Sequence, residues 1–408
     1  VYCGFIPSPA IALYGIQHHI PSMMVTGSHI PDDRNGIKFN KPDGEILKAD
    51  EMAIRRQRVL LPEGKFDQQG RFIHVVSLPE PQPKANANYI ARFIDFLPDN
   101  CLHGRRIGLY EHSSVSRDCI KVVLEALGAE VVSLGRSDAF ISVDTEAIRP
   151  EDITLAKQWA KSNDFDCIIS TDGDGDRPLV SDEKGRWLRG DIAGILCATY
   201  LDVDKVVTPI SSNSAVEKSG YFEQVVRTRI GSPYVIEAMT DLLSESLVVV
   251  GYEANGGFLQ ASDIRHENRL LTALPTRDAL IVPLAILLLA DSLSMPISGL
   301  LERLPQRFTS SDRLKNFPTE LSQRLLGAMQ TGDQEKNINE IRRRFPNIGN
   351  PVSIDSTDGI RVTFDNDDIV HLRPSGNAPE LRCYTESNTH DNAERLNKDC
   401  IALMQQWY

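Results

Sequence analysis

Short apolar runs alternate with amphipathic segments through the central part of the chain. Residues 107–110 and 131–134 are apolar and predict two buried strands. Between them, residues 116–128 carry apolar side chains at helical spacing and end on Gly128, which suits a helix C-terminus. This strand–helix–strand order is typical of α/β domains with parallel sheets, whose ligand loops lie at the carboxyl ends of the strands.

The same alternation continues further along the chain. The run 279–290 is the most apolar segment and contains Pro283. It is too short to cross about 30 Å of hydrocarbon, so we expect a buried core helix there. Further strands are expected at 166–170, 205–208 and 247–250, with a helix over 191–200.

The last hundred residues follow a different pattern. Residues 359–365 alternate with period two, 366–368 form a plausible turn, and 369–373 follow as a second strand. The pattern predicts a hairpin within an antiparallel α+β domain. We expect the basic run 342–344 to form a linker segment before that domain, with its arginines on a solvated helix face.

A chain of 408 residues exceeds one domain of ordinary size. We therefore predict a multi-domain α/β protein with three related α/β domains, which have mixed, mostly parallel sheets, and a C-terminal antiparallel α+β domain. The expected boundaries are 1–85 for an incomplete first domain, then 86–185, 186–305 and 306–408.

Net charge limits the classes of binding partner, and cysteine content indicates the cellular compartment. The 56 acidic and 44 basic residues give a net charge of −12, which disfavours nucleic acid and anionic membranes as partners. An anionic small substrate remains possible where basic groups gather. The seven cysteines are scattered, odd in number and never in Cys-x-x-Cys spacing. They indicate free thiols in a reducing compartment, and we expect a cytoplasmic protein.

The first candidate loop runs from Thr26 to Pro31, after an apolar segment. Ser28 lies there on a tight turn, where a hydroxyl can act as a nucleophile or phosphoryl carrier if a base or a metal assists it. His29 and Lys38 are near in sequence. The structural alternative is an ordinary helix cap or Ser/Thr turn.

Asp172, Asp174 and Asp176 alternate with glycines, and Arg177 follows them. Three carboxylates at this spacing can converge on one hard cation such as Mg²⁺, because glycine permits unusual backbone angles. An EF-hand is excluded, since Arg177 stands where that loop needs glycine. A haloacid-dehalogenase-like phosphatase with Asp172 as nucleophile is an alternative, although Asp176 does not fit its pattern. A solvated acidic turn is disfavoured by charge repulsion.

Two further loops carry polar side chains that suit a sugar phosphate. Glutamate and asparagine two residues apart on a glycine-rich loop can accept from and donate to sugar hydroxyls; the alternative is an Asn-Gly-Gly turn. These candidates are Glu253, Asn255 and Gly256. Later in the chain, two arginines flank small polar residues, a combination that suits a phosphate dianion, although a polar turn with surface arginines is the alternative. These candidates are Arg373, Ser375, Gly376, Asn377 and Arg382.

In this order, the four loops resemble the α-D-phosphohexomutase family, which includes phosphomannomutases, phosphoglucomutases and phosphoglucosamine mutases. The family's Thr-(Ala/Gly)-Ser-His-Asn-Pro is matched at 26–31 with Ile30 in place of Asn. Its Asp-Gly-Asp-(Gly/Ala)-Asp-Arg is matched without change at 172–177. The sugar and phosphate loops match in part, and Arg277-Asp278 resembles a Lys/Arg-Asp pair before an apolar helix in relatives.

The front of the chain departs from the family pattern. Members begin with a Phe-Gly-Thr-(Ser/Ala)-Gly-x-Arg-Gly segment before the serine loop, and this sequence contains none. The start at Val1 lacks an initiator Met. We therefore expect a missing N-terminal segment and an incomplete first domain.

The resemblance implies that Ser28 is phosphorylated and passes its phosphoryl group to a hexose phosphate, which gives a 1,6-bisphosphate that reorients and returns the other group. His29 and Lys38 are the implied general acid/base candidates, and Arg177 adds a fixed positive charge. A basic Lys38 needs a lowered pKa, which burial near the metal and Arg177 could provide. The implied Mg²⁺ ligands are Ser28, Asp172, Asp174 and Asp176.

The implied activity is that of a Mg²⁺-dependent phosphomannomutase, an isomerase that interconverts mannose 6-phosphate and mannose 1-phosphate with a hexose 1,6-bisphosphate as activator. The mannose preference comes from the resemblance alone. Phosphoglucomutase and phosphoglucosamine mutase activities stay open, as do a non-catalytic sugar-phosphate-binding protein and an Asp172 phosphatase. We expect a hinged last domain, and a monomer or a homodimer.

Overall fold

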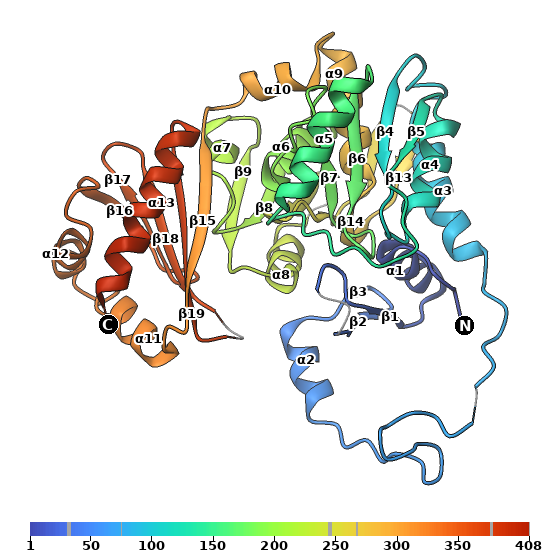
Figure 1. The fold of residues 1–408 in the computed structure, drawn as a ribbon, viewed down its shortest axis with the longest axis horizontal. Coiled ribbons are helices and arrows are strands. Elements are labelled where there is room, and N and C mark those ends of the chain that lie inside the picture. Colours follow the sequence, from blue (N-terminus) through green and yellow to red (C-terminus); the bar gives the residue numbers. More distant parts are fainter. Residues whose placement is uncertain (31–33, 75, 244–246, 267, 376–377, 408) are drawn as a thin grey trace.

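The computed structural model describes residues 1–30, 34–74, 76–243, 247–266, 268–375 and 378–407. Figure 1 shows a row of sheet-containing units, with the C-terminal unit at one end and the N-terminal sheet below the centre. We name four units by their elements: an N-terminal unit (α1–α2), a second unit (α3–β7), a third unit (α6–α10) and a C-terminal unit (β15–α13).

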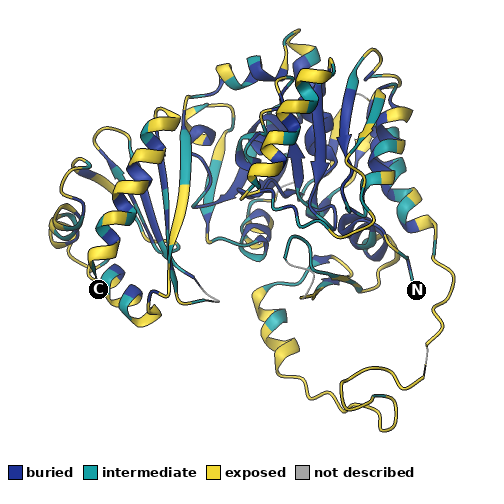
Figure 2. Cartoon of the chain, viewed as in Figure 1, coloured by how far each residue is buried: buried dark blue, intermediate teal, exposed yellow. Residues whose placement is uncertain are grey.

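The N-terminal unit has a small antiparallel sheet in the order β1-β2-β3. In β1, Met23 and Val25 are 60% and 65% exposed, so the outer face of this sheet is open. The described residues between α2 and α3, 56–74 and 76–83, follow a long arc that is mostly exposed (Figure 2). The elements are α1 (Ser8–His18), β1 (Ser22–Thr26), β2 (Gly36–Lys41), β3 (Gly44–Glu45) and α2 (Lys48–Arg55).

The second unit contains a sheet in the order β5-β4-β6-β7, parallel except for the antiparallel pair of β6 and β7. The two strands and the helix predicted between residues 107 and 134 are present here. The elements are α3 (Lys84–Phe96), β4 (Arg106–Tyr110), α4 (Arg117–Ala126), β5 (Glu130–Leu134), α5 (Pro150–Ser162), β6 (Cys167–Thr171) and β7 (Pro178–Val180).

The third unit contains a mixed sheet in the order β14-β11-β10-β8-β9, in which β9, β8 and β10 are parallel. The predicted apolar helix is α9, and residues 281–290 of it are buried. Pro283 lies in its first turn, where proline removes no helical hydrogen bond. The elements are α6 (Gly190–Tyr200), β8 (Lys205–Pro209), α7 (Ala215–Lys218), β9 (Gln224–Thr228), α8 (Ser232–Leu242), β10 (Val249–Tyr252), β11 (Phe258–Gln260), β12 (Ile264–His266), β13 (Arg269–Leu271), β14 (Leu274–Asp278), α9 (Ile281–Ser292) and α10 (Ile297–Arg303).

The C-terminal unit is the predicted antiparallel α+β domain, with the order β15-β19-β18-β17-β16. The expected hairpin is formed by β17 and β18. The basic run 342–344 is the last turn of α12, so the prediction of a linker there is wrong, although Arg342 and Arg343 are exposed on the helix. The elements are β15 (Phe308–Lys315), α11 (Thr319–Gly327), α12 (Gln334–Arg344), β16 (Pro351–Asp355), β17 (Ile360–Phe364), β18 (Ile369–Pro374), β19 (Glu380–Ser387), α13 (His390–Met404) and a final turn, Gln405–Trp407.

The first three units and the C-terminal unit have separate hydrophobic cores of different size. One large cluster joins α1, α3, α4, α6 and α9, so the first three units share a core. The C-terminal unit has a separate core around Phe317, Phe345 and Phe364. Among the described residues, no single helix is long and apolar enough to cross a membrane; α9 and α10 reach that length and composition only as a pair bent by 82°.

Candidate active site

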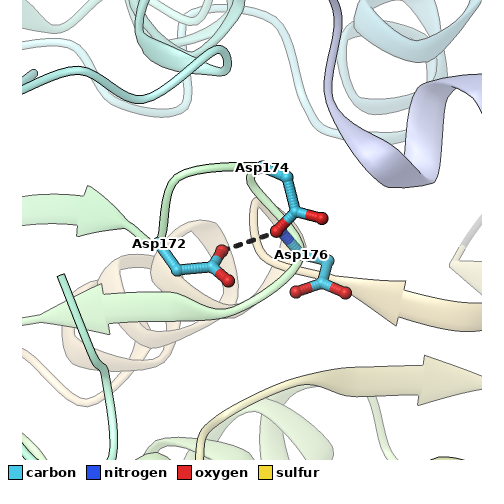
Figure 3. A group of neighbouring side chains, drawn as sticks. All are labelled: Asp172, Asp174 and Asp176. Atoms are coloured by element: carbon cyan, nitrogen blue, oxygen red, sulfur yellow. Dashed lines mark hydrogen bonds between the residues drawn. The ribbon is translucent and has the colours of Figure 1, made fainter. Parts of the chain in front are cut away.

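The aspartate loop lies between the ends of β6 and β7. Asp172, Asp174 and Asp176 are 0%, 1% and 2% exposed. One carboxylate oxygen from each lies within 4.8 Å of the others, and Figure 3 shows the three side chains around one shared space. Burying three carboxylates together is costly unless positive charge compensates them. The arrangement is therefore one that can hold a cation.

Hydrogen bonds from neighbouring residues hold this loop in place. Two of its carboxylate oxygens accept no hydrogen bond from the described residues. Oδ1 of Asp172 accepts from the backbone N–H groups of Asp176 and Arg177, each at 3.2 Å. Oδ2 of Asp174 accepts from the Ser8 hydroxyl at 3.0 Å. Among the described residues, the buried Oδ1 atoms of Asp174 and Asp176 have no hydrogen-bond partner. Orphaned carboxylate oxygens are hard donors that suit Mg²⁺.

The electrostatic environment shifts the pKa values of two of these aspartates in opposite directions. Burial, and then the neighbouring carboxylates of Asp176 and Asp174, raise the pKa of Asp172 well above its usual range. Burial by itself also raises the pKa of Asp176. The positive charges of Arg277 and Lys38 outweigh that effect, so the net pKa of Asp176 is lowered. A cation in the loop would compensate Asp172 in the same way.

Ser28 lies directly against this loop. Its Oγ donates a hydrogen bond of 2.6 Å to Oδ2 of Asp172, which is 144 positions further along the chain. The backbone of Ser28 has a positive φ of 51°, a conformation that non-glycine residues rarely adopt. The side chain that caps this turn is Thr26, whose Oγ1 accepts from the Ser28 N–H at 2.8 Å. The Ser28 hydroxyl is therefore left to face the aspartates.

His29 lies beside the serine hydroxyl, with its Nδ1 3.1 Å from Ser28 Oγ. The guanidinium of Arg177 donates to the same Nδ1 at 3.0 Å, so this nitrogen is an acceptor. Burial, followed by the charge of Arg177, lowers the pKa of His29. The structure thus brings Ser28, His29 and Arg177 together.

Lys38 projects from β2 into the aspartate loop. Its Nζ is 2.6 Å from Oδ2 of Asp174 and also contacts Asp176. Burial alone lowers the pKa of Lys38, but the Asp176 charge opposes it, and the net pKa is raised. The expectation of a lowered pKa was wrong, because a sequence contains no measure of how closely the ammonium approaches the carboxylates.

The predicted sugar loop lies between β10 and β11. Glu253 is 4% and Asn255 is 8% exposed, and Asn255 Oδ1 accepts from the Gly257 N–H at 2.9 Å. Gly256 has φ 90°, which glycine adopts without strain. Oε2 of Glu253 is buried and has no hydrogen-bond partner among the described residues. It pairs instead with Nη1 of Arg277 at 3.5 Å.

The predicted phosphate loop connects β18 and β19. Arg373 and Arg382 face each other across these strands. Arg373 Nε donates to Oδ2 of Asp358 at 2.8 Å, and the same oxygen accepts from the backbone of Ile230 in the third unit at 3.1 Å. Ser375 is 8% exposed. The predicted residues 376 and 377 lie outside the described part of the chain.

Arg277 is a residue of this site to which the sequence assigned no role. It lies near the end of β14, is half-buried, and places Nε 3.1 Å from Oδ2 of Asp176. The available signal was its pairing with Asp278 before an apolar helix. Asp278 itself points away into the core, where it accepts from the Tyr89 hydroxyl at 2.7 Å.

Family models described as phosphoglucomutase/phosphomannomutase match four stretches of the chain. The matches are alpha/beta/alpha domain I at residues 1–58, domain II at 87–185, domain III at 189–308 and the C-terminal domain at 328–403. The chain belongs to the phosphoglucomutase/phosphomannomutase family and is an enzyme of the phosphomutase type.

Two similar relatives are phosphomannomutases. That of Salmonella muenchen is 48% identical over 393 residues, covering 96% of this chain and 79% of the relative. That of Sinorhizobium fredii is 44% identical over 407 residues, covering 99% of this chain and 84% of the relative.

Solved structures share the fold. A putative phosphomannomutase from Thermus thermophilus superposes with a TM-score of 0.72 at 16% identity, covering 98% of this chain and 82% of that one. The N-acetylphosphoglucosamine mutase of Aspergillus fumigatus, in complex with GlcNAc-6P and magnesium, gives 0.64 at 13% identity, covering 98% and 93%. At these identities the likeness concerns the fold.

Proposed function

We propose that this chain is a phosphomannomutase that interconverts mannose 6-phosphate and mannose 1-phosphate through a phosphorylated Ser28. The 2.6 Å contact between Ser28 Oγ and Asp172 Oδ2 carries the proposal. It places a hydroxyl at a buried carboxylate cluster, where a phosphoryl group on that hydroxyl and a divalent cation would share one site.

The phosphoryl group moves in two transfers. In the first, the bond from phosphorus to Ser28 Oγ breaks and a bond to a sugar hydroxyl forms, which gives a hexose 1,6-bisphosphate. In the second, the other phosphoryl group returns to Ser28. His29 and Lys38 are the general acid and base candidates, because they lie beside Ser28 and the aspartates. Arg177 supplies fixed positive charge where negative charge gathers.

The residues of the loop fit a divalent cation. Asp172, Asp174 and Asp176 would hold Mg²⁺ together with an oxygen on Ser28, and two of these carboxylates have an oxygen without a hydrogen bond from any described residue. The ion supplies charge neutralisation for phosphoryl transfer when bound. A hexose 1,6-bisphosphate would act as the activator, because it can phosphorylate Ser28 when the serine is unmodified.

The two remaining loops would bind different parts of the substrate. Glu253, Asn255 and Gly256 would contact the hydroxyls, and the loop after β18 would bind the phosphate that does not react. The preference for mannose is supported by the two phosphomannomutase relatives. Glucose and amino-sugar phosphates are the alternatives that an assay must separate.

The test uses the full chain with Mg²⁺, a trace of hexose 1,6-bisphosphate, and mannose, glucose or glucosamine 1-phosphate. We expect mannose 6-phosphate to form fastest, without release of free phosphate. In Ser28→Ala, turnover should fall by at least about 10³-fold, since the covalent carrier is lost. Mannose 1-phosphate binding, followed by calorimetry, should persist.

Each other outcome contradicts part of the proposal. Free phosphate without isomerisation indicates a phosphatase, and binding without any reaction indicates a sugar-phosphate-binding protein. A faster reaction with another hexose phosphate changes the substrate only. Full turnover in Ser28→Ala would remove the phosphoserine mechanism.

A further inference from the structure

Arg277 bridges the two loops that the proposed reaction must hold together. Its Nε lies 3.1 Å from Oδ2 of Asp176 in the metal loop, and its Nη1 lies 3.5 Å from Oε2 of Glu253 in the sugar loop. The side chains of Arg277, Asp176 and Glu253 are 13%, 3% and 6% exposed. Arg277 Nε and Glu253 Oε2 have no hydrogen-bond partner among the described residues, so both contacts are ion pairs. The extended guanidinium places a different nitrogen against each carboxylate.

A glutamate from the N-terminal unit holds the strand that carries this arginine. Oε1 of Glu45 accepts from the Thr276 hydroxyl at 2.7 Å and from the backbone N–H of Arg277 at 3.4 Å. Oε2 of Glu45 accepts from the Ser232 hydroxyl at the start of α8 at 2.8 Å. One carboxylate therefore fixes β14 and α8 of the third unit against β3.

The sugar loop is shaped to admit the arginine. A Cβ atom on Gly257 would lie 2.6 Å from Cδ and 2.7 Å from Cγ of Arg277, so only glycine leaves space for this side chain. The aliphatic part of Arg277 therefore packs on the loop, while its guanidinium reaches the two carboxylates. Packing against Gly257 and pairing with the two carboxylates therefore both fix the position of the Arg277 side chain.

We propose that Arg277 is a positioning residue that fixes Glu253 relative to Asp176, so that sugar hydroxyls and the reacting phosphoryl group are held at one distance. The inference rests on the proposed function. Because Arg277 engages Oε2 of Glu253, Oε1 is the oxygen that would contact a sugar hydroxyl. It also places a permanent positive charge beside the metal loop, which must weaken cation binding there.

That charge gives the proposal a test that does not depend on turnover. Arg277→Met removes the charge but keeps much of the side-chain volume. Mg²⁺ should then bind about tenfold more tightly, because one positive charge no longer opposes the ion at close range. The measurement is isothermal titration calorimetry of the full chain with MgCl2.

The same variant should lose catalytic efficiency. We expect kcat/KM for mannose 1-phosphate to fall about 100-fold, with a rise in KM, because Glu253 is no longer fixed. Arg277→Lys should restore the Mg²⁺ affinity and only part of kcat/KM, since a single ammonium nitrogen cannot occupy the two separate positions that Nε and Nη1 take against Asp176 and Glu253. Arg265→Met, at an exposed arginine of β12, is the matched control and should change neither quantity.

Weaker Mg²⁺ binding in Arg277→Met, together with a lowered unfolding temperature, would overturn the proposal in favour of a purely structural role. Unchanged kcat/KM would overturn it as well. If the unmodified chain binds Mg²⁺ but turns over no hexose phosphate, the proposed function fails. In that case, the difference in Mg²⁺ affinity between the unmodified chain and Arg277→Met still tests whether the Arg277 charge lies beside the metal loop.

Discussion

At the scale of single residues, burial decides which side chains have shifted pKa values. The environment of His371 in β18 shows this outside the active site. The ring is 2% exposed, stacks on Tyr384 with centroids 5.3 Å apart, and donates from Nε2 to the Asp358 carbonyl at 2.7 Å. Its buried Nδ1 has no hydrogen-bond partner among the described residues. Protonation there would bury a positive charge whose Nδ1–H has no acceptor among the described residues.

This environment predicts a pH dependence of stability. Burial lowers the pKa of His371 to about 4, from 6.5. The unfolded chain therefore binds more protons than the folded one between these values, and the free energy of unfolding should decrease as pH falls from about 6.5 to 4. In His371→Gln, urea unfolding at several pH values should show a shallower slope. An identical slope in both proteins would contradict this prediction.

At the scale of elements, close backbone contacts position the loops. The start of α6 packs directly on the sugar loop: a Cβ atom on Gly190 would lie 2.1 Å from the backbone nitrogen of Gly256. No side chain can occupy that position unless the loop moves. The predicted helix over 191–200 matches α6, but nothing in its periodicity indicates which of its residues touches a loop 66 positions away.

Gly190→Ala should therefore displace the sugar loop. We expect KM for mannose 1-phosphate to rise about tenfold or more and the unfolding temperature to fall, because the added methyl group overlaps the backbone. Steady-state kinetics and thermal unfolding measure the two effects. Gly327→Ala in α11 is the matched control, since nothing lies within 4 Å of its Cβ position. A Gly190→Ala protein that behaves like this control would contradict the prediction.

At the scale of the whole molecule, the cores indicate where it can move. The first three units share one core, whereas the C-terminal unit has its own. A buried polar contact joins the two bodies: Glu386 in β19 accepts from the N–H of Ser214 in the third unit at 3.0 Å. Polar interfaces permit relative motion more readily than a shared apolar core. A hinged C-terminal unit stays a prediction, with this division in its favour.

Substrate phosphate should close that hinge. Arg373 is paired with Asp358, which also accepts from the backbone of Ile230. A phosphate dianion would draw Arg373 towards the site, so X-ray scattering should show a smaller radius of gyration with saturating mannose 1-phosphate. Arg373→Met should lose this change. Unchanged scattering of the original chain, with binding verified by calorimetry, would rule out closure.

The sequence by itself determined the class of the fold, and it predicted which residues form the candidate site. The Asp-Gly-Asp-Gly-Asp-Arg run predicts that its three carboxylates converge, because they are close along the chain. Hydrophobic periodicity predicts α4 and the C-terminal hairpin, and a continuous apolar run predicts α9, since these depend on local sequence. The domain boundaries at 85, 185 and 305 are still predictions.

Only the tertiary structure decided how distant groups meet. The contact of Ser28 with Asp172 was inferred from a resemblance, and no local pattern fixes it. The raised pKa of Lys38 depends on three carboxylates from another unit. The bridging role proposed for Arg277 depends on Glu45, Asp176 and Glu253 together. Such effects fall steeply with distance, and a sequence records separation along the chain but not separation in space.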